Sequence, residues 1–366
     1  MPKIQDITRH LEALAPLNYQ ESYDNAGLLT GNPQNEVKGV LFTLDCLESV
    51  VEEALRKDCN LIVAHHPIIF KGLKSLTGKS YIERTVIQAI KNDIAIYAIH
   101  TNLDQVQNGV NFKIAEKLEL QKVSILSPKT QTLMKLTTFV PASHTSEVLS
   151  ALGQAGAGQI GEYKNCSFRV LGTGTFQPSE KANPYIGTAN QLEEVEEHRI
   201  EVIFPNHLQT AVFKALHEAH PYEEIAYYLH QVENLNQEIG SGAIGELPEA
   251  LEPRLFLAYL KEKMNLQVIR HTQLSNKPIQ KVALCGGAGS FLLAAAKRQK
   301  ADVFITADYK YHEFFDAEGQ ILIADIGHYE SEVYTKELLY DYVRAVFGGL
   351  KLELSEVNTN PVGYFK

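Results

Sequence analysis

The sequence has few cysteines, no surplus of basic residues and no long hydrophobic run. Only four of its 366 residues are cysteines, and they are widely scattered without a C-x-x-C pair. This spacing indicates neither a thiolate zinc site nor a disulfide framework, and it suits a reducing compartment. A formal net charge of -10 leaves no basic excess to neutralise phosphates, which disfavours non-specific nucleic-acid binding.

No stretch of the chain is long and apolar enough to span a bilayer. The N-terminal segment MPKIQDITRHLEALAPL carries charges every few residues and lacks the apolar core of a signal peptide. We therefore expect a soluble cytoplasmic protein with no membrane partner. With 45% hydrophobic and 21% charged residues the composition is that of an ordinary globular protein, and the length favours two folding units.

The two ends of the sequence follow the same α/β plan. Residues 38–66 read as a strand, an amphipathic helix and a second strand, and residues 281–308 repeat this order. Each segment is followed by one more strand, at 94–99 and at 321–325. The alternation predicts parallel sheets with crossover helices. We infer two related α/β lobes that face each other.

A different pattern lies between the lobes, at residues 129–248. It predicts a strand at 133–140, a helix at 144–154, strands at 167–176 and 199–204, a helix at 207–219 and a strand at 224–232. This is the ferredoxin-like β-α-β-β-α-β order. Residues 177–198 are a polar excursion between the middle strands. We therefore expect an inserted ferredoxin-like α+β domain at 129–248, within a discontinuous α/β domain of residues 1–128 and 249–366.

Three predicted strands of the lobes end at residues that commonly bind metals. LIVAHHP (61–67) brings His65 and His66, IAIYAIHTNLD (94–104) ends at Asp104, and ILIADIGHYESE (321–332) leads into a helix with His328 and Glu332. The four-residue spacing puts His328 and Glu332 on one helical face, where they can bind one ion. Ligands of open α/β sheets bind beyond the carboxyl ends of the strands, where all five residues lie.

Each of these motifs has a plainer interpretation when it is taken alone. Adjacent histidines at a strand end are often turn or core residues, and a His-x-x-x-Glu pair is commonly solvated. Asp104 could cap a helix that starts near Gly109. Neighbouring side chains of a strand point to opposite faces, but a turn at Pro67 could direct both imidazoles toward two adjacent ions. The coincidence of the motifs at three strand ends favours metal binding.

Five ligands are too many for one tetrahedral ion that keeps an open position. Two divalent metal ions per chain, bridged by a carboxylate, fit the set better. We choose Glu332 as the bridge and as the candidate catalytic residue. Histidine with carboxylate and no thiolate permits zinc, manganese, iron or nickel, and the sequence does not choose among them.

Further polar residues lie near the same edge of the predicted sheets. His100 is either a ligand or an outer partner of one. Asp308 and His312 follow the strand at 302–306, and orienting the ligands is the preferred interpretation for them. Asp45 and Asn25 are additional candidates for lining the cleft.

Two other motifs have structural interpretations. CGGAGS (285–290) joins a strand to an apolar helix and could present backbone N–H groups to an anion, but it lacks the G-K-[ST] ending of a nucleotide P-loop. Tight packing is the preferred interpretation.

The segment HPYEE (220–224) places an imidazole, a phenol and two carboxylates around a proline, and this proline also suits a helix end. We expect a structural or interface role for it.

Four segments carry a resemblance to a known family: DNAGLLTG (24–31), AHHP (64–67), HTNLD (100–104) and GHYESE (327–332). They resemble the Nif-three-like family of dinuclear metal-centre proteins, whose members are often labelled GTP cyclohydrolase 1 type 2 homologues. The resemblance covers both lobes. It implies that Glu332 touches both ions and that the metal ligands are His65, His66, Asp104, His328 and Glu332.

The middle block is similar to the CutA-like domain that some bacterial members of this family carry between their halves. The similarity lies in GTFQPSEKANPYIG (174–187), EHRIEVIFP (197–205) and AHPYEEIAYYL (219–229). The resemblance further implies a homohexameric toroid with the metal sites facing its internal cavity. The insert is then expected to lie over the ring openings.

The resemblance and the ligand set together suggest a metal-dependent hydrolase that acts on a nucleotide or another phosphorylated small molecule. Two ions can share and activate a water between them. The family label implies attack on the guanine ring of GTP, although the sequence has no nucleotide fingerprint. The alternative is a non-catalytic metal-binding or regulatory assembly with a ligand-sensing insert. DNA binding through the ring fits poorly with the acidic balance of the chain.

Overall fold

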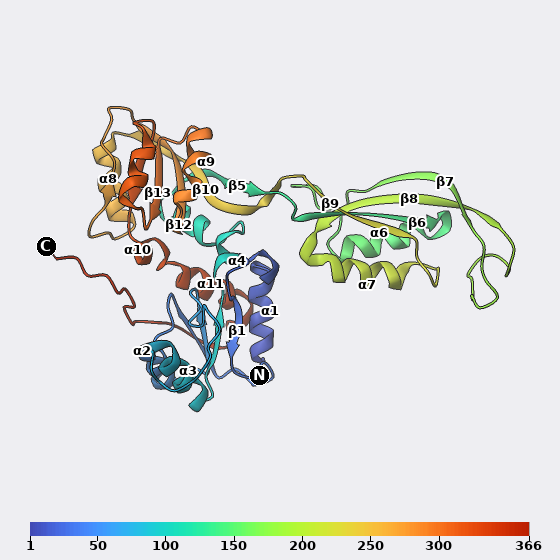
Figure 1. Cartoon of the computed structure of the whole chain (residues 1–366), viewed down its shortest axis with the longest axis horizontal. Helices are drawn as coiled ribbons and strands as arrows, with labels where there is room; N and C mark the ends of the chain where they lie inside the picture. The colour runs from blue at the N-terminus through green and yellow to red at the C-terminus, as the bar shows by residue number, and fades with distance from the viewer. Residues whose placement is uncertain (366) are drawn as a thin grey trace. The chain divides into compact units, whose positions relative to one another are not determined.

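The computed structural model describes residues 1–365, which divide into two compact units (Figure 1). The discontinuous unit consists of Met1–Pro128 and of the chain from Glu238 onward, and the middle unit is Lys129–Gln237. The discontinuous unit contains two sheets and the middle unit contains one. None of the helices within the described range is long and apolar enough to cross a membrane.

The first sheet of the discontinuous unit has the strand order β1-β4-β3-β2-β15. Its neighbours are parallel except for β1, which runs antiparallel at the edge. The strands are β1 (Gly27–Thr30), β2 (Gly39–Thr43), β3 (Leu61–Ala64), β4 (Ala95–Ala98) and β15 (Lys351–Leu354). Strands β2, β3 and β4 are buried along their whole length, because helices cover both faces of the sheet.

Alternate residues of these strands enter two different cores. Leu41 and Ile62 pack with α2 (Glu48–Arg56) and α3 (Tyr81–Lys91) on one face. Val40 and Leu61 pack with α1 (Ile4–Leu14) and α11 (Thr335–Phe347) on the other. Such a strand has no solvated face, so its sequence is a continuous run of apolar residues.

The second sheet has the order β11-β14-β13-β12-β10-β5. Its strands are β5 (Gln121–Lys129), β10 (Asn236–Leu251), β11 (Arg270–His271), β12 (Ile279–Ala288), β13 (Val303–Ala307) and β14 (Leu322–Asp325). Helix α9 (Leu293–Arg298) packs on one face, and α5 (Val110–Lys117) and α8 (Pro253–Lys263) contribute to the core on the other. That second core is continuous with the core under α1 and α11, so the two sheets share it.

The predicted relationship between the two lobes is confirmed by the strand registers. Val40 pairs with Leu61 in the parallel β2–β3 ladder, and Val282 pairs with Val303 in the parallel β12–β13 ladder. In both sheets the third parallel strand, β4 or β14, lies beside an antiparallel edge strand, β1 or β11. The carboxyl ends of β4 and β14 are therefore equivalent positions in the two related lobes, and β3 corresponds to β13.

The middle unit has the predicted β-α-β-β-α-β order. Its elements are β6 (Leu133–Pro141), α6 (Thr145–Gln154), β7 (Phe168–Phe176), β8 (Glu193–Pro205), α7 (Gln209–Ala219) and β9 (Tyr227–Val232). The antiparallel sheet has the order β7-β8-β6-β9, and α6 and α7 lie on one of its faces (Figure 1). The other face carries no helix of this unit (Figure 1).

One strand of this unit was predicted too short. The strand expected at 199–204 begins at Glu193, so the polar excursion expected at 177–198 ends earlier. The missed residues are mostly glutamates, which give no apolar signal. They nevertheless pair with β7 from Gly172 to Phe176, because a hairpin whose outer face is solvated tolerates charged side chains.

Candidate metal centre

The five predicted ligands converge at the carboxyl ends of three strands. His65 and His66 follow β3, and Asp104 ends the short helix α4 (Thr101–Asp104), which begins two residues beyond β4. Helix α10 (His328–Glu332) follows β14 after a turn at Gly327, whose φ of 91° favours glycine. Each strand is buried and rigid, so it delivers its terminal polar residues to a fixed place.

The first group of potential ligands consists of His66, His328 and Glu332. The Nε2 atoms of both histidines lie 3.0 Å from Oε2 of Glu332, and 3.4 Å from each other. Ligands of a tetrahedral zinc ion are about 3.4 Å apart when each bond is about 2.1 Å long. These three atoms are therefore spaced as they would be around one metal ion.

The second group consists of His65, Asp104 and Glu332. Nε2 of His65 lies 3.6 Å from Oδ1 of Asp104 and 3.9 Å from Oε1 of Glu332. Nε2 of His65 and Oδ1 of Asp104 are both buried and form no hydrogen bond within the described chain. Buried polar atoms without partners are costly, so these two atoms fit a metal ion that would satisfy them.

Each of the three histidines is held by its second ring nitrogen. Nδ1 of His66 lies 2.7 Å from Oδ1 of Asp45, and Nδ1 of His328 lies 2.7 Å from Oδ2 of Asp308. Nδ1 of His65 lies 2.8 Å from the carbonyl oxygen of Ile99. Because Nδ1–H donates to an oxygen in each case, Nε2 is the nitrogen that faces the cluster, and in the neutral ring it offers its lone pair to a metal ion.

His100 and Asp24 extend the cluster on the side of His65. Nδ1 of His100 lies 2.7 Å from Oδ1 of Asp24, and His100 forms a further group of potential ligands with His65 and His66. Oδ2 of Asp24 accepts hydrogen bonds from the hydroxyl and the backbone N–H of Thr101. Asp24 was missed by the sequence reasoning, although it is the first residue of the DNAGLLTG motif.

Burial and charge fix the protonation of the two carboxylates of the cluster. Burial alone would raise the pKa of Glu332, but the hydrogen bonds from His328 and His66 outweigh it and hold that pKa well below its usual range. Burial, followed by the charge of Glu332, raises the pKa of Asp104 well above its usual range. The buried Glu332 and the half-buried Asp104 thus compete for positive charge, which a bound cation would supply.

The pKa values of the three histidines also shift in opposite directions. Burial lowers the pKa of His65 to about 3, so this ring is neutral. Burial also acts against protonation of His66, but the carboxylates of Asp45 and Glu332 outweigh it and raise the pKa of His66 to about 10. For His328, Glu332 and then Asp308 likewise overcome burial and raise the pKa to about 9. Without a cation, Glu332 thus lies between two protonated imidazoles, those of His66 and His328, while His65 is neutral.

A glycine of the CGGAGS segment packs directly against Glu332. Gly287 has a φ of +60°, and a Cβ atom at this position would lie 2.5 Å from Oε1 of Glu332. Its backbone N–H donates to the hydroxyl of Ser331 at 3.0 Å. The preferred interpretation of this segment was tight packing, but the sequence alone did not reveal that the packed partner is the central carboxylate.

Two of the weaker candidates lie outside the cluster. His312 was expected to orient ligands, but it is exposed, and its ring lies near the rings of Tyr311 and Phe315. It sits in the 3-10 helix Tyr311–Ala317, which turns it away from the strand end. Asn25 donates to the carbonyl oxygen of Ile69 at 2.6 Å, so its amide braces a loop.

The donor set as a whole could hold a metal ion. It combines imidazole nitrogens with carboxylate oxygens, and its histidines are oriented by outer partners as metal-bound histidines usually are. The two groups of ligands share Glu332 and use different oxygens of it.

The whole chain is similar to known proteins. The family model Duf34/NIF3 (NGG1p interacting factor 3) matches residues 2–361. A Bacillus subtilis (strain 168) protein named GTP cyclohydrolase 1 type 2 homolog is 39% identical over 363 residues, 98% of this chain and 97% of that protein. A solved Bacillus cereus protein related to NIF3 is 38% identical, with a TM-score of 0.86 and coverage of 100% and 99%. A solved Staphylococcus aureus protein is 31% identical, with a TM-score of 0.79 and the same coverage.

Proposed function

Because the chain belongs to the Duf34/NIF3 family, we propose that its cluster is a dinuclear metal centre that hydrolyses a nucleotide or another phosphorylated small molecule. One observation carries this proposal above all. The two oxygens of Glu332 serve two different groups of potential ligands, one with His66 and His328 and the other with His65 and Asp104. A single ion would leave one of these groups without a cation.

In this proposal His66 and His328 hold one ion, His65 and Asp104 hold the other, and Glu332 bridges them. Such a pair of divalent ions supplies a polarised water at neutral pH and stabilises negative charge on the oxygens of the substrate. Zinc, manganese, iron and nickel all accept this donor set.

The residues of the chain provide the positioning. Asp45 and Asp308 hold His66 and His328 in one orientation, so the ligand atoms need no rearrangement when ions bind. Glu332 is only 3% exposed, which keeps bulk water from competing for its oxygens. His100, hydrogen-bonded to Asp24 beside the rings of His65 and His66, is placed to contact a substrate or water at the metal ions.

A cavity of about 400 Å³ adjoins the cluster and gives the substrate a place to bind. His66 and His328 form part of its wall, and other parts are contributed by Arg270, Tyr329 and Tyr364. This volume lies within the range of small-molecule sites. The name that the bacterial relatives carry makes GTP the first nucleotide to test.

The test is a hydrolysis assay of the metal-loaded protein with GTP, other nucleotides and simple phosphoesters. We expect turnover by the wild type, loss of at least a hundredfold in Glu332→Ala, and unchanged turnover in His312→Ala, which removes an exposed histidine outside the cluster. Equal turnover by wild type and Glu332→Ala would exclude the proposed mechanism. A loaded centre that hydrolyses none of these compounds would favour a non-catalytic metal-binding assembly instead.

Three further parts of the proposal rest on resemblance and composition. The first is a homohexameric ring. The second is a CutA-like domain at residues 129–248, inserted between the parts 1–128 and 249–366 of the metal domain. The third is a cytoplasmic location, which suits the scattered cysteines. Light scattering on the purified protein tests the first. A mass of one, two or three chains would contradict a hexamer.

A further inference from the structure

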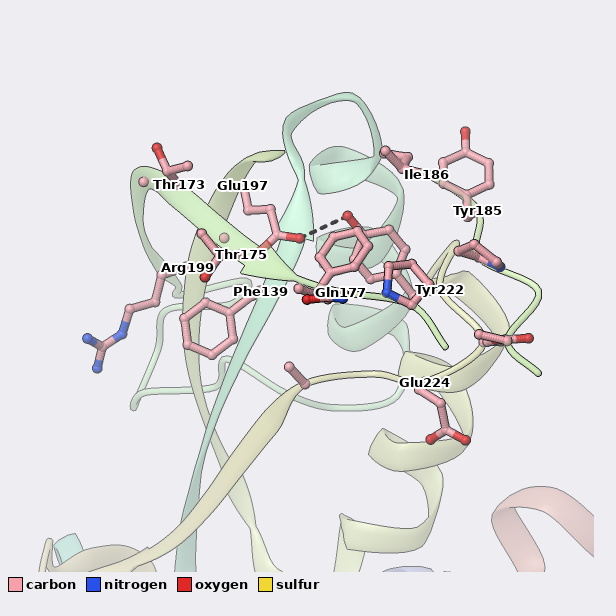
Figure 2. Close-up of a pocket in the computed structure, with 18 of the residues that line it drawn as sticks. Phe139, Thr173, Thr175, Gln177, Tyr185, Ile186, Glu197, Arg199, Tyr222 and Glu224 are labelled. Carbon is pink, nitrogen blue, oxygen red and sulfur yellow. Dashed lines mark hydrogen bonds between the residues drawn. The ribbon is translucent and has the colours of Figure 1, made fainter. Parts of the chain in front are cut away.

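The middle unit contains a cavity of about 760 Å³ that has no part in the metal centre (Figure 2). It lies on the face of the sheet that α6 and α7 leave open. Phe139 of β6, Val170 of β7 and Arg199 of β8 form its floor, since these three residues stand opposite one another in the sheet. Its rim comes from residues 177–186 and from the HPYEE segment.

Glycines make room for this cavity. Gly172 and Gly174 occupy successive positions of β7 on the open face, where Gly172 stands opposite Glu197. A Cβ atom at Gly172 would have no neighbour within 4 Å, so the missing side chain leaves open space. At Gly174 a Cβ atom would lie 2.1 Å from Oε2 of Glu197. The absence of a side chain there lets the Glu197 carboxylate lie against the strand.

Glu197 supplies a buried carboxylate to the cavity wall. The residue is only 7% exposed, and its Oε1 accepts a hydrogen bond from the hydroxyl of Tyr222 at 2.9 Å (Figure 2). Oε2 accepts no hydrogen bond from any residue that the structure describes. Burial, and then Glu197 itself, raise the pKa of Tyr222, so the phenol stays a donor. Oε2 is not a fully enclosed atom, so a ligand in the cavity can reach it and donate a hydrogen bond to it.

The charges around the cavity favour a cation. Glu197, Glu223 and Glu224 contribute three carboxylates, and Arg199 is the one basic residue of the described lining. The guanidinium of Arg199 is paired with Glu201 at 2.7 Å, and in Figure 2 it points away from Tyr222. A phosphate or carboxylate ligand would therefore meet repulsion and find no free cation.

Aromatic rings surround the same carboxylate. The ring of Tyr222 lies 5.8 Å from that of Phe176 and 6.4 Å from that of Tyr185, measured between centroids. Phe139 and Tyr228 add two further rings, 5.8 Å apart. The faces of such rings attract organic cations, and their area favours an apolar body over a hydrated metal ion.

We propose that this cavity binds a small organic cation, a protonated amine on an apolar or aromatic body. Its ammonium group donates to Oε2 of Glu197 and lies against the rings of Tyr222 and Phe176, and its body fills the space above Gly172. The site is independent of the proposed hydrolysis and gives the middle unit a ligand of its own.

Ligand-observed NMR with the full-length protein tests this proposal, with phenethylamine as the probe and phenylacetate as its anionic counterpart. We expect saturation transfer to phenethylamine and none to phenylacetate at the same concentration. Glu197→Gln should weaken phenethylamine binding at least tenfold, because it removes the charge but keeps an acceptor for Tyr222. Glu218→Gln, which removes the same charge from an exposed position of α7, should change nothing.

Gly172→Leu provides a second, independent variant. A side chain can be added there without a clash, so the variant should fold, fill the cavity and abolish binding. Equal binding of phenethylamine and phenylacetate, or unchanged binding in both variants, would overturn the proposal. The wild type could also fail to bind phenethylamine while Gly172→Leu changes the oligomeric mass. This result would show that another copy of the chain covers this face, and it would overturn the proposal as well.

Discussion

Nε2 of His66 and Nε2 of His328 lie 3.4 Å apart, although 262 positions separate these residues in the chain. His66 follows a strand of the first sheet and His328 follows a strand of the second. Because both atoms also lie 3.0 Å from Oε2 of Glu332, the cluster is complete only when both lobes have folded and packed. Assembly of this side-chain cluster thus requires folding of both parts of the discontinuous unit.

Single substitutions should remove the two ions separately. In Asp104→Ala the group of His66, His328 and Glu332 is intact, so we expect about one ion per chain in place of about two. His328→Ala should also leave about one ion, held by the other group, and Glu332→Ala should leave almost none. The measurement is elemental analysis of protein that has been dialysed after loading with zinc.

The control for this series is His312→Ala, which removes an imidazole from an exposed position outside the cluster. It should bind as many ions as the wild type. If Asp104→Ala and His328→Ala each lost all metal, the centre would behave as one indivisible site. If the wild type bound only about one ion, the bridging role of Glu332 would be wrong.

Asp45→Asn should weaken metal binding without unfolding the protein. Asp45 lies 2.7 Å from Nδ1 of His66, and its second oxygen accepts from the hydroxyl of Thr359 at 2.5 Å. The asparagine amide keeps the size of the side chain but loses the negative charge that makes the imidazole of His66 a better metal ligand. Such changes reduce metal affinity by about tenfold to a hundredfold. Competition with a zinc chelator measures the change. Asp341→Asn, at an exposed position of α11, should bind as the wild type does.

The position of the ligands was predictable because their spacing reflects local structure. His65 and His66 come directly after a buried apolar strand and His328 follows another after a short turn, and the ends of parallel strands in an α/β fold are where ligands bind. His328 and Glu332 share a helical face through their four-residue spacing. Local periodicity and strand topology were therefore sufficient to bring the five residues together.

What orients the ligands could not be predicted in the same way. Asp24 reaches His100 from a segment 76 positions earlier, and Gly287 approaches Glu332 from β12, which lies two strands away from β14 in the same sheet. Such contacts depend on the packing of whole elements, which no local pattern encodes. His312 shows the converse error, because its place after a strand resembled that of a ligand while a 3-10 helix turned it outward.

Gly287→Ala should damage the metal centre more than the fold. A methyl group at Gly287 would lie 2.5 Å from Oε1 of Glu332 and 3.2 Å from Cε1 of His328, so the carboxylate must move. The left-handed backbone adds strain of about 1–2 kcal/mol. We expect zinc affinity to fall by more than tenfold.

Gly319→Ala is the matched control for this backbone conformation. Gly319 has a φ of +68°, close to that of Gly287, but a Cβ atom there would have no neighbour within 4 Å. The Gly319→Ala variant should show the effect of backbone strain alone, which is a small loss of thermal stability with unchanged zinc affinity. Equal zinc affinity of both variants would mean that Glu332 does not depend on the close approach of Gly287.

Glu53 should stabilise the fold in a pH-dependent way. This residue of α2 is 1% exposed, and its carboxylate accepts from the hydroxyl of Ser355, the backbone N–H of Glu356 and the ammonium of Lys57. Burial alone would raise its pKa, but these hydrogen bonds outweigh burial and lower it. A group whose pKa falls on folding stabilises the folded state at pH values above its unfolded pKa.

The stabilisation by Glu53 is therefore complete above about pH 5 and is lost as the pH falls through its lowered pKa in the folded state. Glu53→Gln should reduce the free energy of unfolding at pH 7 by about 1–3 kcal/mol, since the buried hydroxyl of Ser355 and the partly buried N–H of Glu356 lose their charged acceptor. Below the folded-state pKa the difference between wild type and variant should shrink. Urea unfolding between pH 3 and pH 7, in the presence of a chelator, measures both effects without a contribution from metal binding.

Glu48→Gln is the control, because it breaks the exposed pair with Arg84. This variant should lose less than about 1 kcal/mol of unfolding free energy at any of these pH values. A difference for Glu53→Gln that stayed constant with pH would show that packing, and not the carboxylate charge, holds Ser355 and Glu356 against α2.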